Sequence, residues 1–175
     1  MRHPFLFSPE YAMMDCEVKI RMAFNIVLHE PLIPANTGNI ARTCAATGTR
    51  LHLIKPLGFS TDDRYLKRAG LDYWHAVDLT YYESFEDFAA RNPEGRFFFI
   101  ETDGDRYHSD VSYRDGDFFV FGKETSGIPQ EIIQQFPGQI IRIPMGDATR
   151  SLNLSNTAAI VLYEGLRQIG YPGMK

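Results

Sequence analysis

Short apolar runs alternate with stretches of helical period along the chain from Ala23 onward. The apolar runs predict strands at 25–29, 51–55, 76–79, 97–101, 118–121 and 140–143, of which the run at 76–79 is the weakest. The segments between them predict helices at 36–47, 62–69, 84–91, 129–135 and 153–169. Such alternation is typical of an α/β domain, so we expect a mainly parallel sheet flanked by helices.

The last predicted helix, 153–169, carries the clearest helical pattern. One stripe consists of apolar or small residues, namely Leu154, Ala158, Val161, Leu162, Gly165 and Ile169, and we expect it to pack on the sheet. Ile160 and Tyr163 lie off this stripe. Either the core stripe is wider than usual, or the helix meets a second surface such as another subunit.

Length and composition indicate how many domains the chain forms and where in the cell it is expected. The chain has 175 residues, 44% hydrophobic and 23% charged, which is enough for one substantial core. We therefore predict one domain over 22–175. Residues 1–21 show no settled period and are treated as an extension, either a weakly packed arm or an added start. With no apolar run long enough to cross a membrane and no signal-peptide pattern, we expect a cytoplasmic protein with no membrane partner.

The cysteines and the charged residues limit which ligands the protein is expected to bind. The two cysteines, Cys16 and Cys44, belong to no CxxC motif or Cys/His cluster, so we expect no metal site. The net charge of −4 means that binding to RNA would need a local basic patch. One candidate is a basic face of the helix at 62–69, formed by Arg64, Lys67 and Arg68. The alternative is an ordinary solvated helix face.

The first polar segment is PLIPANTGNIARTCAATG, residues 31–48. Asn36 or Thr37 is predicted to cap its helix, which places Asn39 and Arg42 on one face with Thr43. A phosphate or a ribose could be held there by the amide of Asn39 and the planar guanidinium of Arg42. The alternative is an ordinary cap followed by a solvated arginine.

Two further polar segments follow predicted strands, where ligands of open α/β sheets usually bind. In FFVFGKETSGIP, glycines at 122 and 127 flank three polar residues, which suits either a loop wrapped against a flat ligand such as adenine or a simple turn. In IIRIPMGDATRSLNLSN, residues 140–156, the polar Ser151, Asn153 and Ser155 are more than helix capping requires. No GxGxxG or GxxxxGK[ST] motif occurs, which argues against Rossmann and P-loop folds.

Together these segments resemble the SPOUT, or α/β-knot, RNA methyltransferases, and among them the small tRNA wobble-nucleotide 2′-O-methyltransferases of the TrmL type. The resemblance runs from about residue 24 to residue 173 and includes IVLHEPLIPANTGNIARTCAATG, LKRAGLDYW, FGKETSGIP, IRIPM and SLNLSNTAAIVLYEGLRQIGYPG. It implies a deep C-terminal trefoil knot, a homodimer, S-adenosyl-L-methionine as methyl donor, and no separate RNA-binding domain.

The resemblance also implies roles for particular residues. It assigns the methyl donor to Ile100, Gly122, Ile143, Ser151 and Leu152. It makes Arg42 the leading catalytic candidate, gives Glu124 and Tyr163 a part in the active site or the RNA grip, and assigns the target ribose and phosphate to Asn36 and Asn39. An arginine is an awkward general base because its guanidinium stays protonated, and the alternative is that Arg42 holds the adjacent phosphate or stabilises a developing alkoxide. The prediction is that Arg42 is needed for the reaction, with either role open.

The implied activity is 2′-O-methylation of the wobble nucleotide, position 34, in the anticodon stem-loop of tRNA. The base would be cytidine or a modified uridine, and the substrates would be leucine tRNAs. One alternative is a SPOUT 2′-O-methyltransferase that acts on another tRNA position or on rRNA, because the fold does not identify the substrate. A second alternative is a non-catalytic RNA-binding or donor-sensing protein.

Overall fold

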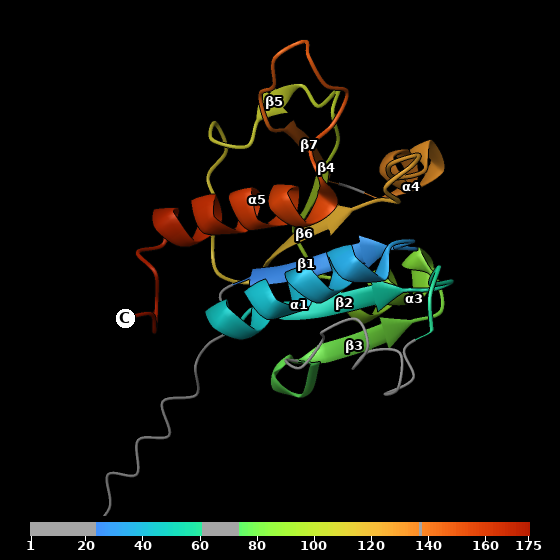
Figure 1. The fold of residues 1–175 in the computed structure, drawn as a ribbon, viewed down its shortest axis with the longest axis horizontal. Coiled ribbons are helices and arrows are strands. Elements are labelled where there is room, and N and C mark those ends of the chain that lie inside the picture. Colours follow the sequence, from blue (N-terminus) through green and yellow to red (C-terminus); the bar gives the residue numbers. More distant parts are fainter. Residues whose placement is uncertain (1–23, 61–73, 137) are drawn as a thin grey trace, which may run out of the picture.

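A parallel sheet forms the centre of the fold (Figure 1). The computed structural model describes residues 24–60, 74–136 and 138–175. Within these residues seven strands pair, all in parallel, in the order β3-β2-β1-β6-β4-β7-β5. They are β1 Phe24–His29, β2 Arg50–Ile54, β3 Leu79–Tyr82, β4 Phe97–Ile100, β5 Arg106–Tyr107, β6 Asp117–Phe121 and β7 Gly138–Arg142. The predicted mainly parallel sheet is confirmed.

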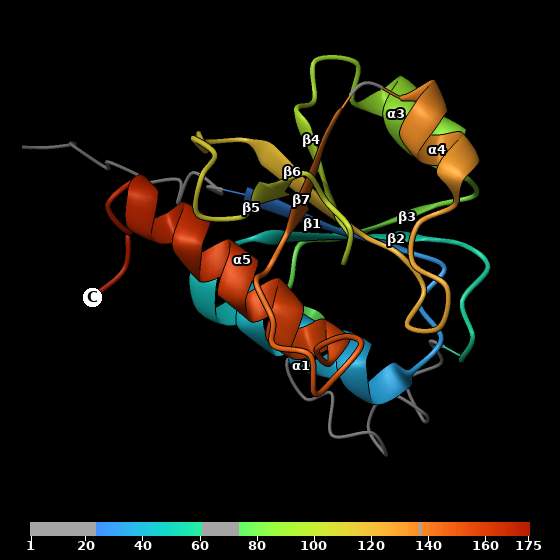
Figure 2. The ribbon, with the colours of Figure 1, turned by 90° about the horizontal axis from the view of Figure 1, so that it is seen from above.

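Helices cover both faces of the sheet (Figure 2). They are α1 Pro34–Thr47, α3 Phe85–Arg91, α4 Gln130–Gln135 and α5 Leu154–Gln168. α1 and α5 lie side by side on one face, and α3 and α4 lie on the other. Because both faces are covered, every residue of β1 is buried, and alternate side chains enter two separate hydrophobic cores.

The sequence predictions hold best where a strand is apolar throughout and least well where it is short or polar. The weak strand predicted at 76–79 is wrong, because a 3-10 helix occupies Trp74–Ala76 and β3 begins only at Leu79. β5 was not predicted, since its two residues are exposed and polar or amphipathic. The predicted helix at 62–69 and the extension at 1–21 lie outside the described residues.

β7 occupies an unusual place in the sheet, between β4 and β5. Although β7 follows β5 in the sequence, it pairs between β4 and β5 and does not form the edge of the sheet. The predicted knot stays a prediction, and this strand order agrees with it.

α5 packs its predicted stripe against the sheet and leaves a second surface exposed. Its buried residues are Ser155, Ala158, Val161, Leu162, Gly165 and Leu166, while Leu154 and Ile169 are half-buried. Ile160 and Tyr163 are 40% and 45% exposed. In the part of the chain that the structure describes, no helix is long and apolar enough to cross a membrane.

Candidate active site

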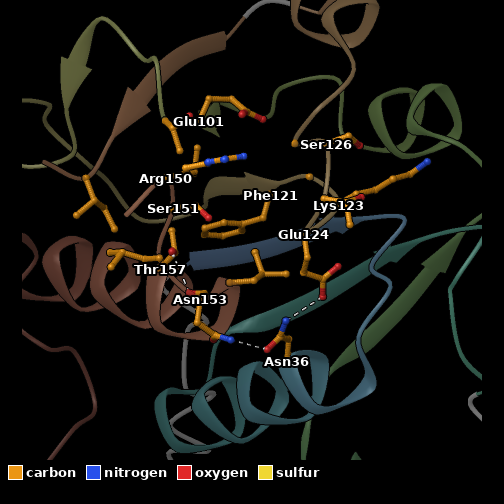
Figure 3. Close-up of a pocket in the computed structure, with 18 of the residues that line it drawn as sticks. Asn36, Glu101, Phe121, Lys123, Glu124, Ser126, Arg150, Ser151, Asn153 and Thr157 are labelled. Atoms are coloured by element: carbon orange, nitrogen blue, oxygen red, sulfur yellow. Dashed lines mark hydrogen bonds between the residues drawn. The ribbon is translucent and has the colours of Figure 1, made fainter. Parts of the chain in front are cut away.

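A cavity of about 540 Å³ opens at the carboxyl ends of β4, β6 and β7 (Figure 3). Ligands of open parallel sheets commonly bind at this edge. The cavity is lined by the start of α1 and by the segments that follow the three strands, namely Ile33, Asn36, 100–102, 121–127, Ile143, Met145, 150–154 and Thr157. Its volume suits a ligand of the size of a nucleoside derivative.

The structure brings most of the predicted site residues to this cavity. Lining residues include all those predicted to bind the donor, Ile100, Gly122, Ile143, Ser151 and Leu152, together with Asn36 and Glu124. Asn39, Arg42 and Tyr163 are exposed and are not among the lining residues. The predicted basic face of Arg64, Lys67 and Arg68 lies outside the described residues. The roles of all these residues stay predictions.

The loop after β6 is closed by contact between two glycines. A backbone bridge joins Lys123 and Gly127, whose amides each donate to the other's carbonyl at 3.1 and 2.9 Å. A Cβ at Gly122 would lie 2.0 Å from the carbonyl carbon of Gly127, so no larger residue fits there. Gly127 has a φ of +70°, which also favours glycine. The two glycines therefore allow the loop to close tightly on itself at the wall of the cavity.

Glu101 is a cavity residue that the sequence did not single out, because it was counted as the last residue of a strand. β4 ends at Ile100, so Glu101 begins the loop. Its carboxylate accepts a hydrogen bond of 2.6 Å from the amide of Ile128. Burial raises the pKa of Glu101, and the bond from Ile128 opposes that rise. A carboxylate directly after an apolar strand, beside a glycine-bearing loop, was the signal that could have identified it.

Glu124 holds the start of α1. Its carboxylate accepts hydrogen bonds from the amides of Leu32 and Ile33 at 2.9 and 3.1 Å, and from Nδ2 of Asn36 at 3.0 Å. The prediction that Asn36 or Thr37 caps the helix is wrong, because α1 begins at Pro34 and both residues lie inside it. A distant carboxylate supplies the acceptor that a local cap would provide.

Asn36 continues this connection to α5. Its Oδ1 accepts a hydrogen bond of 2.9 Å from Nδ2 of Asn153. Asn153 in turn caps α5, since its Oδ1 accepts from the amide and the hydroxyl of Ser155 at 2.9 and 2.7 Å. The polar residues at the start of α5 thus do more than cap it, as predicted. A continuous chain of hydrogen bonds fixes the loop after β6, α1 and α5 around the cavity (Figure 3).

The lining combines apolar surface with charges of both signs. Ile100, Phe121, Ile143 and Leu152 supply apolar surface for a ring, and Glu101 supplies an acceptor for a hydroxyl or an attraction for a cation. Lys123 is paired with Glu30 at 2.5 Å. These groups fit S-adenosyl-L-methionine, which has a flat adenine, a ribose diol and a sulfonium. Within the described residues, no three His, Cys, Asp or Glu side chains cluster as metal ligands would.

Solved structures share this fold. A Bacillus anthracis protein, provisionally described as an RNA methyltransferase, is 57% identical with a TM-score of 0.81, over 87% of this chain and 98% of that one. A structure described in terms of 2-OH methylation of C/U34 on tRNA is 42% identical with a TM-score of 0.78, over 84% of this chain and 96% of that one. The fold is that of the SPOUT class of RNA methyltransferases.

Sequence comparison identifies the family. The profile described as the SpoU rRNA Methylase family matches residues 23–163. The tRNA (cytidine(34)-2'-O)-methyltransferase of Escherichia coli (strain K12) is 53% identical over 151 residues, which are 85% of this chain and 96% of that protein. The chain belongs to the SpoU rRNA methylase family.

Proposed function

We propose that this protein methylates the ribose 2′-hydroxyl of the tRNA nucleotide at position 34, with S-adenosyl-L-methionine as donor and S-adenosyl-L-homocysteine as product. The observation that carries the proposal is the cavity at the ends of β4, β6 and β7, where all five predicted donor residues meet. The Escherichia coli relative, which matches over nearly its whole length, is named for this activity. A tRNA substrate also supports a cytoplasmic location.

The reaction is a displacement in which the 2′-oxygen bonds to the methyl carbon, the carbon–sulfur bond breaks, and the hydroxyl proton departs. The bound donor supplies the sulfonium methyl group. In this site the bare backbone at Gly122 and the apolar side chains of Ile143 and Leu152 hold a ring and exclude water. Alignment of the two reactants in such a site provides much of the rate acceleration.

Arg42 is proposed to act on the target nucleotide, although it does not line the cavity of its own chain. It lies six positions after Asn36 on α1, which rotates it by about 240° around the helix axis at 3.6 residues per turn. Asn36 faces the cavity, so Arg42 points to a different side of the helix, where it is exposed. We propose that it acts in the cavity of a second copy.

We accordingly propose a homodimer in which α1 and α5 form the interface. Ile33, Ile160 and Tyr163 are large apolar or aromatic residues that are 44%, 40% and 45% exposed. Ile33 precedes α1, and the other two lie on α5, which packs beside α1. Sedimentation should show about twice the chain mass, and a monomer that stays fully active at nanomolar concentration would contradict the dimer.

The RNA grip is proposed to involve Asn39 on α1 and the basic residues Arg64, Lys67 and Arg68 of the segment outside the described residues. Because the chain is acidic overall, phosphate contacts need such a local cluster. Replacing the three basic residues by alanine should weaken tRNA binding and flatten its salt dependence, with donor affinity unchanged. An unchanged salt slope would make this segment an ordinary solvated surface.

The proposed substrates are leucine tRNAs with cytidine or a modified uridine at position 34. The matched family is described by rRNA methylation, so rRNA, or another tRNA position, is the second candidate. Mapping 2′-O-methylated nucleotides in RNA from cells with and without the gene separates these cases. Loss of methylation at position 34 supports the proposal, and loss at an rRNA site or elsewhere in tRNA overturns it.

A further inference from the structure

A second cavity of about 500 Å³ adjoins the first, and we call it the outer cavity. It lies where β5 and the end of β7 meet the segment that follows β7. Its lining residues are Thr102, Tyr107, 142–147, Thr149 and Arg150. It shares Thr102, Ile143, Met145 and Arg150 with the first cavity, so a ligand in one lies next to a ligand in the other.

The lining of the outer cavity has the groups that recognise a nucleotide. The guanidinium of Arg142 lies over the ring of Tyr107, 5.1 Å from its centroid. The Tyr107 side chain is still 40% exposed, so protein does not cover this stack. Nε of Arg142 is buried and has no hydrogen-bond partner among the described residues. Bases that leave an RNA helix commonly stack on such aromatic rings and guanidinium planes.

Charge in the outer cavity also favours an anionic ligand. Two arginines, Arg142 and Arg150, line it together with one carboxylate, Asp147. A protein with a net charge of −4 needs such local positive charge to hold a phosphate group. Arg150 belongs to both cavities, and its guanidinium can meet a phosphate at their junction.

The first cavity is large enough to hold the whole methyl donor, which leaves the outer cavity for the other reactant. We propose that the outer cavity binds a nucleotide of the RNA substrate, whose base extends the Tyr107–Arg142 stack and whose phosphate contacts Arg150. This inference rests on the proposed function, since it assigns a place to the RNA beside the donor. None of these three residues was singled out by the sequence patterns.

The test replaces Tyr107, which is on a short strand at the edge of the sheet and can be changed without disturbing the core. Tyr107→Ala should weaken tRNA affinity at least about fivefold, the lower end of the range for losing one stacked base. Tyr107→Phe and Tyr107→Trp should restore the affinity, because stacking needs the ring and not the hydroxyl. Calorimetry with S-adenosyl-L-homocysteine should give the same donor affinity for all of them.

A matched control is available at the opposite edge of the sheet. Arg91 of α3 lies over the ring of Tyr82 at 5.2 Å, in the same kind of stack but away from both cavities. Arg91→Gln should leave tRNA affinity unchanged, whereas Arg142→Gln should lower it. Circular dichroism and thermal unfolding establish that each variant is folded before its affinity is compared.

The outcomes separate the inference from the proposed function. If wild-type protein methylates tRNA but Tyr107→Ala binds tRNA as tightly as wild type, the inference is overturned and the function stands. If donor affinity falls while tRNA affinity does not, the outer cavity holds the amino-acid end of the donor, which also overturns it. If the folded wild-type protein neither binds nor methylates tRNA, the proposed function fails, and the inference fails with it.

Discussion

From its contacts we expect Glu124 to position α1, in contrast to the part in the active site or the RNA grip that the resemblance implies. Its carboxylate accepts three hydrogen bonds, from two amides at the start of α1 and from the side chain of the buried Asn36. Glu124→Ala removes all three acceptors at once. We expect it to destabilise the fold, to loosen the first turn of α1, and to weaken donor binding, because Asn36 and Glu124 both line the donor cavity.

The size of the effect follows from which groups lose their partners. The amide of Ile33 lies in an exposed hydrogen bond, so water can replace the carboxylate there. The amide of Leu32 and Nδ2 of Asn36 are partly buried, and each loses a bond to a charged group worth about 1.5 kcal/mol or more. We therefore expect the free energy of unfolding to fall by about 3 kcal/mol. Glu124→Gln keeps one acceptor but turns an amide donor toward other donors, so it should lose about half as much.

Urea unfolding measures this loss, calorimetry with S-adenosyl-L-homocysteine measures donor affinity, and single-turnover assays measure methyl transfer at saturating donor and tRNA. Glu83→Ala is the matched control, because the Glu83 carboxylate is 76% exposed and pairs with Lys55 on the surface. It should change stability by less than about 1 kcal/mol. If Glu124→Ala is as stable as wild type and loses only its transfer rate, the positioning role is wrong and Glu124 acts on the reacting groups.

Three further predictions concern the loop glycine, the catalytic candidate and a buried histidine. Gly122→Ala should lower donor affinity more than tenfold in calorimetry, because its Cβ would collide with the loop backbone, whereas Gly146→Ala, with nothing within 4 Å, should not. Arg42→Ala should abolish methyl transfer and Arg42→Lys should impair it severely, with donor binding intact in both. If the rate of Arg42→Ala stayed within about threefold of wild type, a change in activation free energy of less than about 1 kcal/mol, Arg42 would be a surface residue. His52 is buried, which lowers its pKa from 6.5 to about 4, so its neutral form is favoured by folding. That stabilisation is complete above pH 6.5 and is lost as the pH falls toward 4, by about 2 kcal/mol between pH 7 and pH 5. Urea unfolding should show this loss in wild type and a smaller one in His52→Gln; equal losses would assign the pH dependence to other groups.

Local patterns predicted the strands of the sheet centre well, because a strand buried on both faces is mostly apolar. β4 and β6 are of this kind, with the sequences FFFI and DFFVF, and their boundaries differ from the prediction by one residue. The order of the strands was not predictable from such patterns. Nothing local in β7 indicates that it pairs with β4 and β5, which precede it by about thirty to forty residues.

The site shows the same limit of local reasoning. Asn36 has the side chain of a helix cap and stands near a helix start, yet its partners are Glu124 and Asn153, which are 88 and 117 positions away. The sequence could propose it as a site residue and still assign it the wrong contacts. Ser151 and Gly122 line the cavity, and their role in donor binding stays a prediction. Glu101 was missed because it was assigned to the strand that ends at Ile100, and Tyr107 because its two-residue strand has no pattern of its own.

α1 connects the two halves of the proposed chemistry. Its first turn is fixed to the cavity by Glu124 and, through Asn36, to the start of α5. Its exposed face carries Asn39 and Arg42, which we propose to serve the target nucleotide. A helix transmits the placement of its first turn along its length, because its backbone hydrogen bonds hold successive residues at fixed rotation and rise. In the proposed homodimer, the position of the donor loop in one subunit would determine where Arg42 stands relative to the second subunit, so small changes at Glu124 are expected to affect methyl transfer through α1.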